Sequence, residues 1–305
     1  MRRVVEVRGL YKRFGRIEAL RGLSAHFPRG VSGLVGPNGS GKTTMIHVLA
    51  GLVRPDAGEA RVLGLDCWRE SLEVRRRVGF LLEEVRVPPH VTVRKYLERV
   101  AKLKGASAAD AAEVAERVGL APYLSRRVGT LSAGMLRMLG LAQALVGDPE
   151  LVVMDEPTAN LDPIRRAALA DYVREAWREG GVSFLISSHN LLELEEVCEW
   201  AALIHEGRLI DQGPLAELYS KYGGDEYELR VSDAAAFSRL VQELGLGEVL
   251  RVEGSLVAVR ATRESLGRLL LEASRSGVEV LSFRPASGLL GVFRRALSEV
   301  GARAS

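Results

Sequence analysis

Cysteine is scarce in this sequence. Its 305 residues include two, Cys67 and Cys198, which lie far apart and do not show the spacing of metal ligands. With so few cysteines, a disulfide scaffold is disfavoured, and so is a zinc cluster. Both thiols are therefore expected to be buried and reduced.

Long apolar runs are missing as well. No stretch of about 18 consecutive apolar residues occurs, so the chain is not expected to span a bilayer alone. The N-terminal segment MRRVVEVRGLYKRF opens with two arginines but lacks the long apolar core of a signal peptide. These absences predict a soluble protein of a reducing compartment.

The sequence also lacks a strong excess of one charge sign. Its formal net charge is +3, which is small for this length, and arginine is scattered rather than gathered in a block. A nucleic-acid footprint is not indicated, so no nucleic-acid partner is expected.

The remaining composition is that of an ordinary globular protein, with 47% hydrophobic and 27% charged residues in a length that favours two domains. Short apolar runs recur between helical patterns. Such runs are typical of strands buried on both faces, and their alternation with helices predicts an α/β fold with a largely parallel sheet. The runs are VVEV near Val4, SGLV near Val35, VGFLL near Leu81, LVVM at 151–154, VSFLI at 182–186 and WAALI near Leu203.

Helical patterns fill the spaces between these runs. One of them has Asp162 as a good N-cap, followed by Pro163, which suits a first helical turn. The predicted helices span 43–52, 93–103, 108–118, 134–145, 163–178 and 191–199.

The composition shifts near Tyr222-Gly223-Gly224-Asp225, and a domain boundary is predicted at about residue 220. The patterns that follow are EYELRV, a helix at 234–244, EVLRV, SLVAVR, a helix at 264–274 and VEVLSF. This β-α-β-β-α-β order predicts a small ferredoxin-like α+β domain, with a last helix at 289–300.

The segment GPNGSGKTT, from Gly36 to Thr44, lies between an apolar strand and a helix. Its glycines allow backbone N–H groups to surround a phosphate, Lys42 adds a positive charge, and Thr43 offers a hydroxyl to Mg²⁺. A plain glycine turn before a helix is the alternative. The pattern favours a loop that holds a nucleoside triphosphate.

In LVVMDEP, an apolar strand ends at Asp155 and Glu156, which places both carboxylates at the carboxyl edge of the sheet. Asp155 is suited to the Mg²⁺ shell, and Glu156 to polarising a water in line with the γ-phosphate. The alternative is a pair of capping carboxylates before Pro157.

In LSAGM, at 131–135, a hydroxyl and small residues precede a helix, which makes a second anion-binding helix start. A plain helix cap is the alternative for this short segment. Because the chain has one lysine loop for two such helix starts, LSAGM is interpreted as completing the site of a second copy.

Together these residues resemble one family, the ATP-binding cassette (ABC) ATPases. GPNGSGKTT is similar to the Walker A loop, LVVMDEP to the Walker B strand and LSAGM to the family signature. ANLD at 159–162 resembles the D-loop, and SSHN at 187–190 resembles the segment of the switch histidine. The resemblance covers residues 1 to about 215. It implies a P-loop NTPase nucleotide-binding domain at 1–220, with a helical subdomain at about 84–147. The shift in composition assigns residues 221–305 to the small α+β accessory domain.

The resemblance also implies roles for single residues. Tyr11 is expected to stack on adenine, Ser132 and Gly134 to reach the γ-phosphate of the partner's ATP, and Asp162 to help join the two halves. His189 is expected to sense the γ-phosphate and fix the attacking water. The implied catalytic residues are Glu156, His189 and Lys42, and the implied metal ligands are Thr43, Asp155 and Glu83. The implied ATP-binding residues are Tyr11, Gly36, Pro37, Asn38, Gly39, Ser40, Gly41, Lys42, Thr43, Thr44, Glu83, Ser132, Gly134 and Asp162.

The sequence departs from the family pattern at three places. Glu83 stands where most relatives have glutamine, and a carboxylate there repels γ-phosphate more than an amide. Ala133 replaces the usual glycine of the signature, and Arg137-Met138 replaces a polar Gln-Arg pair. The resemblance therefore does not predict which contacts the residues after the signature make.

Three functions compete for such a chain. The first is the ATPase subunit of a transporter, with Mg²⁺ and ATP as cofactors; its partners are a second ATPase chain, identical or closely similar, and separate membrane-spanning permease subunits. The second is a soluble cassette ATPase acting on ribosomes or DNA, and the third is a non-enzymatic binding module. The tail SFRPASGLLGVFRRAL resembles that of drug-export ATPases, which favours an exporter placed on the cytoplasmic face of the cell membrane.

Overall fold

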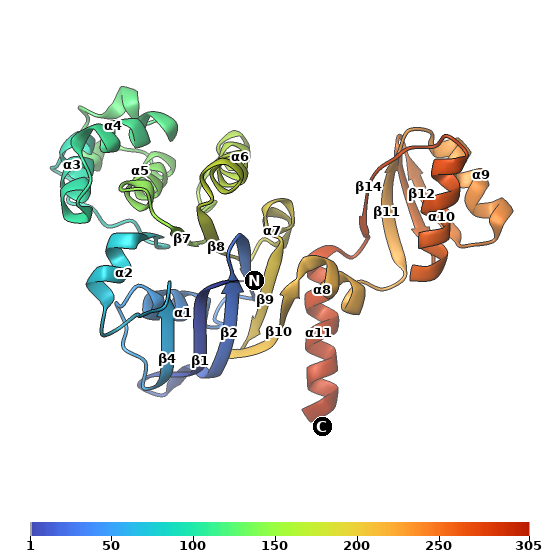
Figure 1. Ribbon diagram of the computed structural model, residues 1–305, viewed down its shortest axis with the longest axis horizontal. Coiled ribbons are helices and arrows are strands. Elements are labelled where there is room, and N and C mark those ends of the chain that lie inside the picture. Colours follow the sequence, from blue (N-terminus) through green and yellow to red (C-terminus); the bar gives the residue numbers. More distant parts are fainter. Residues whose placement is uncertain (1, 305) are drawn as a thin grey trace. The chain divides into compact units, whose positions relative to one another are not determined.

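The computed structural model describes residues 2–304, with side chains described over 2–299. The chain divides into an N-terminal unit, Met1–Pro214, and a C-terminal unit, Leu215–Ser305 (Figure 1). The division precedes α8 (Leu215–Tyr222), which contacts the last helix, α11 (Gly288–Ala304). The predicted boundary at residue 220 falls inside α8, because the change in composition comes at the end of that helix rather than at its start.

The centre of the N-terminal unit is a six-stranded sheet with the order β10-β9-β3-β8-β7-β6. Strand pairs from β9 to β6 are parallel, whereas β10 joins β9 in antiparallel fashion. Every residue of β3, β7 and β8 is buried, which explains the continuous apolar runs of these strands. The strands are β3 (Val31–Val35), β6 (Val78–Leu81), β7 (Leu151–Asp155), β8 (Ser183–Ser188), β9 (Trp200–His205) and β10 (Arg208–Pro214).

The predicted helices between these strands are confirmed to within a few residues at their ends. Two short helices, α2 (Ser71–Arg77) and α8, were not predicted from the sequence. The confirmed helices are α1 (Lys42–Leu49), α3 (Val93–Lys104), α4 (Ala108–Arg117), α5 (Ala133–Leu145), α6 (Pro163–Gly180) and α7 (Leu191–Val197). Within residues 2–304, none of the helices is both long enough and apolar enough to cross a membrane.

A second sheet of the N-terminal unit corrects the sequence analysis. The run VVEV was assigned to the parallel sheet, but it belongs to β1 (Arg3–Phe14), in an antiparallel sheet with the order β2-β1-β4-β5. The other strands are β2 (Ile17–Pro28), β4 (Ala57–Val62) and β5 (Leu65–Asp66). A tight turn joins β1 to β2, so these two strands pair with each other rather than with β3.

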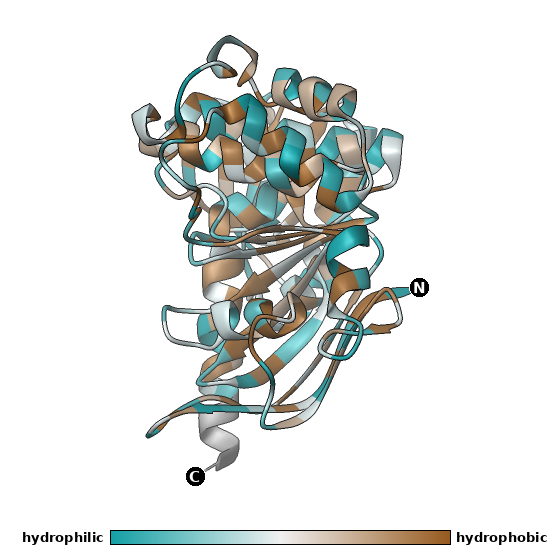
Figure 2. Cartoon of the chain, turned by 90° about the vertical axis from the view of Figure 1, so that its left-hand side faces the viewer, coloured by the Kyte–Doolittle hydropathy of each residue, from teal (hydrophilic) through white to brown (hydrophobic). Residues whose placement is uncertain are grey.

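The main core of this unit lies between the two sheets and includes α1. Met45, Ile46 and Leu49 of α1 pack in one cluster with Phe27 of β2 and Leu185 of β8. Each fully buried side chain of this size contributes about 1.5–3 kcal/mol to stability. The cluster therefore fixes α1, and with it the loop that precedes α1. Figure 2 shows the strands across the middle largely in the hydrophobic colour, while the helices above them carry both colours.

The helices α3, α4 and α5 form a helical part between β6 and β7 (Figure 1). Thr92 caps α3, and Ser107 and Asp110 form a capping box at the start of α4. Two short 3-10 helices, η1 (Ala121–Tyr123) and η2 (Val128–Thr130), connect α4 to α5. The start of α5 is therefore carried by this helical part rather than by a strand of the sheet.

The C-terminal unit confirms the predicted ferredoxin-like order. Its antiparallel sheet has the order β12-β13-β11-β14, and α9 and α10 supply Phe237, Val241, Leu266 and Leu269 to the core against the sheet. The elements are β11 (Glu226–Val231), α9 (Ala234–Leu244), β12 (Glu248–Glu253), β13 (Leu256–Arg260), α10 (Arg263–Arg275), β14 (Val280–Pro285) and α11.

Candidate nucleotide-binding site

The loop after β3 is shaped to hold phosphate. A Cβ on Gly36 would lie 2.3 Å from the Ile204 carbonyl oxygen and 2.6 Å from Ser40 Oγ, so only glycine fits there. Gly41 has a φ of 103°, and a Cβ on it would lie 2.7 Å from the Ala19 carbonyl oxygen. Glycine at these two positions thus lets the loop pack closely against β9 and β2 just before α1 begins. The free N–H groups at the start of such a helix are suited to bind an anion.

Lys42 points back into this loop. Its Nζ donates to the carbonyl oxygens of Gly36 at 2.7 Å and of Pro37 at 3.1 Å, and the residue is 5% exposed. Burial lowers the pKa of Lys42, while the charges of Glu156, Asp155 and Glu83 act in the opposite direction. The ammonium group and three carboxylates therefore converge on one region, as a site for polyphosphate and metal requires.

Asp155, at the end of β7, is fully buried. Its Oδ1 accepts a hydrogen bond from Ser187 Oγ, whereas its Oδ2 is buried and has no hydrogen-bond partner among the described residues. A buried carboxylate oxygen is costly unless a partner satisfies it. Since carboxylate oxygens are ligands that Mg²⁺ accepts, Asp155 fits the metal role predicted for it.

Glu156 is held in a conformation unusual for its residue type. Its φ is 48°, and its backbone N–H donates to the Ser187 carbonyl oxygen at 3.2 Å and to Ser187 Oγ at 3.1 Å. Its Oε2 lies 2.8 Å from Nδ1 of His189. Burial raises the pKa of Glu156, and the neighbouring His189 acts against that rise. A carboxylate with a raised pKa is a better proton acceptor than a free glutamate.

The structure brings Glu83 to the same edge of the sheet. Glu83 and Thr43 line one cavity of about 570 Å³ beyond the end of β6. Thr43 is half-buried in the first turn of α1, and the Glu83 side chain is exposed. Two of the three predicted metal ligands, Thr43 and Glu83, therefore line one cavity, with Glu83 at its solvent side.

The signature residues are placed by the start of α5. Ser132 is exposed and caps the helix, its Oγ accepting from the Met135 N–H at 3.3 Å. Gly134 is buried, and a Cβ on it would lie 3.3 Å from the Asn160 carbonyl oxygen and 3.2 Å from Arg165 Nη1. The signature thus packs against the D-loop, whereas the phosphate loop packs against β2 and β9.

Asp162 is the N-cap of α6. Its carboxylate accepts from the Arg165 N–H at 2.9 Å and pairs with Arg165 Nη1 at 3.1 Å. The hydrogen bond from the Arg165 backbone lowers the pKa of Asp162. The structure therefore gives Asp162 a capping role, and its predicted part in joining two chains stays a prediction.

Strand pairing decides which aromatic side chain faces the phosphate loop. Lys12 pairs with Leu20, and Leu20 Cδ2 lies 3.0 Å from the position of a Cβ on Gly41. Because paired residues share a face, Lys12 lies on the side of the phosphate loop. Its Nζ lies 5.4 Å from the centre of the Phe14 ring, which is 48% exposed.

The Tyr11 side chain points to the opposite face of β1 from the Lys12 side chain, because successive residues of a strand point to opposite faces. Its hydroxyl lies 2.8 Å from the position of a Cβ on Gly22 of the neighbouring strand. The structure therefore turns Tyr11 away from the face that carries Lys12 and Phe14. The register between β1 and β2 shifts just before Tyr11 and just after Lys12, and the sequence pattern alone does not reveal these shifts.

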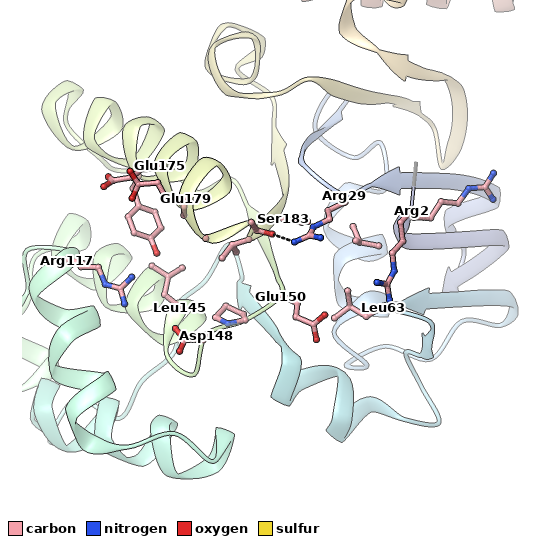
Figure 3. A pocket seen from close by; sticks show the side chains of 18 of the residues that line it. Arg2, Arg29, Leu63, Arg117, Leu145, Asp148, Glu150, Glu175, Glu179 and Ser183 are labelled. Carbon is pink, nitrogen blue, oxygen red and sulfur yellow. Dashed lines mark hydrogen bonds between the residues drawn. The ribbon is translucent and has the colours of Figure 1, made fainter.

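A cavity of about 870 Å³ lies at the other end of the parallel strands, where Glu150 precedes β7 and Ser183 begins β8. Figure 3 shows Glu175 and Glu179 of α6 on one side of this cavity and Arg2 and Arg29 on the other. Ligands of open α/β sheets bind at the carboxyl ends of the strands. The cavity contains none of the predicted site residues and is not the nucleotide site.

Two residues that the sequence analysis did not assign belong to the site. Ser187 connects Asp155 to the backbone of Glu156, and the segment SSHN that contains it was a usable signal. Arg137 donates to the carbonyl oxygens of Glu83 and Glu156, and nothing in the sequence around it reveals this contact.

Comparison with known proteins identifies relatives over most of the chain. A family model described as ABC transporter matches residues 20–159. The daunorubicin/doxorubicin resistance ATP-binding protein DrrA of Streptomyces peucetius is 37% identical, over 92% of this chain and 88% of the relative. The bacitracin transport ATP-binding protein BcrA of Bacillus licheniformis is 31% identical, over 92% of each chain.

A solved structure shares the fold of the N-terminal part. The dimeric structure of a bacterial ABC transporter cassette superimposes with a TM-score of 0.65 at 21% identity, over 69% of this chain and 98% of that one. At this identity the likeness shows the fold alone. The predicted P-loop NTPase cassette is thereby confirmed.

Proposed function

The chain belongs to the ATP-binding subunits of the ABC transporter family, and from this premise we propose that it drives export as one of a pair of ATPase chains. The partner is a second copy or a close paralogue, and the pair acts on separate membrane-spanning subunits. The names of the relatives, which include drug resistance and antibiotic transport, support export over an action on ribosomes or DNA. The proposed location is the cytoplasmic face of the membrane.

The nucleotide is proposed to lie on the loop from Gly36 to Thr44. Backbone N–H groups and Lys42 hold the phosphates, and the close packing of Gly36 against β9 and of Gly41 against β2 fixes the loop in place. Lys42 exchanges the neutral carbonyl oxygens of its own loop for the negatively charged oxygens of phosphate, which accept a stronger hydrogen bond from its ammonium group.

Mg²⁺ is proposed to be held by Thr43 and Asp155, with Glu83 at the solvent side of the shell. The unsatisfied Oδ2 of Asp155 is the observation that supports this assignment. When bound, the ion neutralises charge on the phosphate oxygens during phosphoryl transfer. Ser187, which donates to Oδ1, leaves Oδ2 as the free ligand atom.

Glu156 is proposed to accept a proton from the attacking water. Its contact with His189 orients the carboxylate, and burial makes it more basic than a free glutamate. His189 is 60% exposed at its side chain, so its other ring nitrogen is free to meet the γ-phosphate. These residues support the hydrolysis of ATP to ADP and phosphate.

The pair of chains is proposed because, among the described residues, the phosphate loop and the signature pack against different segments. The phosphate loop contacts β2 and β9, while Ser132 starts a helix that contacts the D-loop. Ser132 is exposed and has a free face for the phosphate of another chain. The cassette that shares this fold was solved as a dimer, which supports a pair of chains.

A cross-link tests this shared site. Asn38 and Ser132 are both exposed, whereas Ser40 is 1% exposed, so Asn38→Cys and Ser132→Cys form the suitable pair. In a Glu156→Gln background with Mg²⁺ and ATP, a short bis-maleimide is expected to join separate chains. The native thiols do not interfere, because burial raises the pKa of Cys67 to about 12 and also raises that of Cys198.

The control pair is Asn38→Cys with Leu103→Cys, which is 73% exposed on α3 and outside the proposed contact. It is expected to give no nucleotide-dependent product on a denaturing gel. If the Asn38–Ser132 pair also fails to join chains at saturating ATP, the shared site is wrong.

Phe14 is proposed to take the adenine-stacking role first assigned to Tyr11, since Phe14 lies with Lys12 on the phosphate-loop side. Phe14→Ala is expected to raise the KM for ATP about 5- to 10-fold, the lower part of the range for base stacking, because half of the ring is exposed. Tyr11→Ala is the matched control and is expected to change KM less than twofold. The opposite order of effects in steady-state ATPase assays would restore Tyr11 to this role.

A further inference from the structure

Arg137 lies in the second turn of α5 and is 5% exposed, although it carries a positive charge. Burial lowers its pKa to about 10, which still leaves the side chain protonated at neutral pH. A buried charge is costly unless hydrogen bonds compensate it. The partners of Arg137 therefore indicate what this residue stabilises.

All five N–H groups of the guanidinium are used, and each meets a backbone carbonyl oxygen. Nε donates to Pro157 at 3.2 Å, and Nη2 donates to Glu156 at 2.6 Å and to Asp155. Nη1 donates to Leu82 at 2.5 Å and to Glu83 at 2.9 Å. One side chain thus joins α5 to the segment after β6 and to the segment after β7.

These carbonyls belong to the backbone that carries the proposed base. The Glu156 N–H is held by Ser187, and its carbonyl oxygen is held by Arg137. The positive φ of Glu156 needs such support from both sides, because a glutamate does not adopt it readily. Arg137 also holds the backbone of Glu83, which lines the cavity shared with Thr43.

The same helix carries the signature. Ser132 caps α5, and Arg137 lies five positions further along the helix, a rise of about 7.5 Å. A helix transmits displacement along its axis as a rigid rod. A movement of α5 that begins at Ser132 therefore reaches the carbonyls of Glu156 and Glu83 through a single side chain.

We propose that Arg137 is a positioning residue that couples the signature end of α5 to the hydrolytic site of its own chain. When the partner chain holds nucleotide against Ser132, α5 moves, and Arg137 passes this movement to the backbone of Glu156 and Glu83. The coupling rests on the proposed two-chain site, whereas the positioning of Glu156 by Arg137 needs one chain only. Arg137 touches no reacting atom and acts through the backbone.

The test compares Arg137→Lys and Arg137→Met with a matched control on the same helix. Lys104 is a half-buried cation that also binds carbonyls, with its Nζ 3.1 Å from the Ala144 carbonyl oxygen and 2.9 Å from the Val146 carbonyl oxygen at the far end of α5. Lys104→Met therefore removes a similar charge and similar hydrogen bonds without touching the catalytic segments. Each full-length variant is assayed for kcat, KM, Hill coefficient and Tm.

For Arg137→Met we expect kcat to fall on the order of 10²-fold with KM within threefold, because the base is misplaced while the phosphate loop is unchanged. Arg137→Lys is expected to fold stably, to lose about tenfold in kcat and to shift the Hill coefficient towards 1. Lys104→Met is expected to keep kcat within twofold of the wild-type value, while its Tm falls about as much as that of the Arg137 variants. A third variant, Arg137→Ala, leaves space for a free guanidinium ion, which at low millimolar concentration is expected to raise the kcat of this variant and not that of Lys104→Met.

The positioning role is overturned if Arg137→Lys keeps the wild-type kcat and Hill coefficient, or if the loss of kcat follows the loss of Tm equally in the Lys104 variant. An unchanged Hill coefficient with a reduced kcat overturns the coupling alone. These results are separable from a failure of the proposed function, in which wild-type protein itself hydrolyses no ATP.

Discussion

Replacing Glu156 by glutamine is expected to reduce the rate of ATP hydrolysis about 10³-fold, within the range for removal of a general base. Glutamine keeps the shape of the side chain and its contact with His189, but its amide does not accept a proton from water. The same change removes a negative charge near Asp155 and Glu83, where γ-phosphate is proposed to lie. ATP-bound pairs should therefore persist, and light scattering at saturating ATP should report twice the monomer mass.

Glu84→Gln serves as the control for this experiment. Glu84 is an exposed carboxylate that pairs with Arg86, and it lies beside Glu83 without contacting Glu156. Its turnover should stay within twofold of wild type. Retention of more than a tenth of the activity by Glu156→Gln would exclude Glu156 as the base, and a monomer at saturating ATP would argue against the shared site.

Lys42→Ala is expected to weaken nucleotide binding about 10²- to 10³-fold. The change leaves a buried phosphate without its charged partner, which costs about 2–5 kcal/mol. The carbonyl oxygens of Gly36 and Pro37 also lose their donor, so the empty loop should become somewhat less stable. Equilibrium binding of a fluorescent ATP analogue, measured together with Tm, separates the two effects.

Lys104→Ala provides the matched comparison, because Lys104 is a half-buried lysine that binds carbonyls outside the nucleotide site. The Tm of Lys104→Ala should fall, whereas its affinity for the fluorescent ATP analogue should stay unchanged. Unchanged ATP binding by Lys42→Ala would invalidate the assignment of the phosphate loop itself.

The parts of the site that lie in contiguous segments could be predicted from the sequence. The loop from Gly36 to Thr44 and the pair Asp155-Glu156 each follow an apolar strand, so local pattern places them at the carboxyl edge of one sheet. The contact between His189 and Glu156 follows from the same rule, because β8 lies directly beside β7.

What escaped prediction depends on pairing and on contacts between distant segments. The antiparallel sheet of β1, β2 and β4 needs strand register, and register shifts beside Tyr11 and Lys12 decide which aromatic ring faces the loop. Arg137 looked only like a departure from a polar pair. Its carbonyl partners, such as Leu82 and Pro157, belong to two other segments of the chain, and no local pattern encodes such a meeting.

The left-handed backbone of Glu156 has a consequence for how this protein tolerates heat. Such a conformation costs a non-glycine residue about 1–2 kcal/mol, and the burial that raises the pKa of Glu156 adds a further cost for keeping its carboxylate charged. A glycine at position 156 would remove both costs. Such a protein is expected to have a higher Tm but to lack the proposed catalytic base. Selection for thermal stability alone would not keep a glutamate at this position. Its presence is therefore a compromise in which catalytic activity outweighs stability.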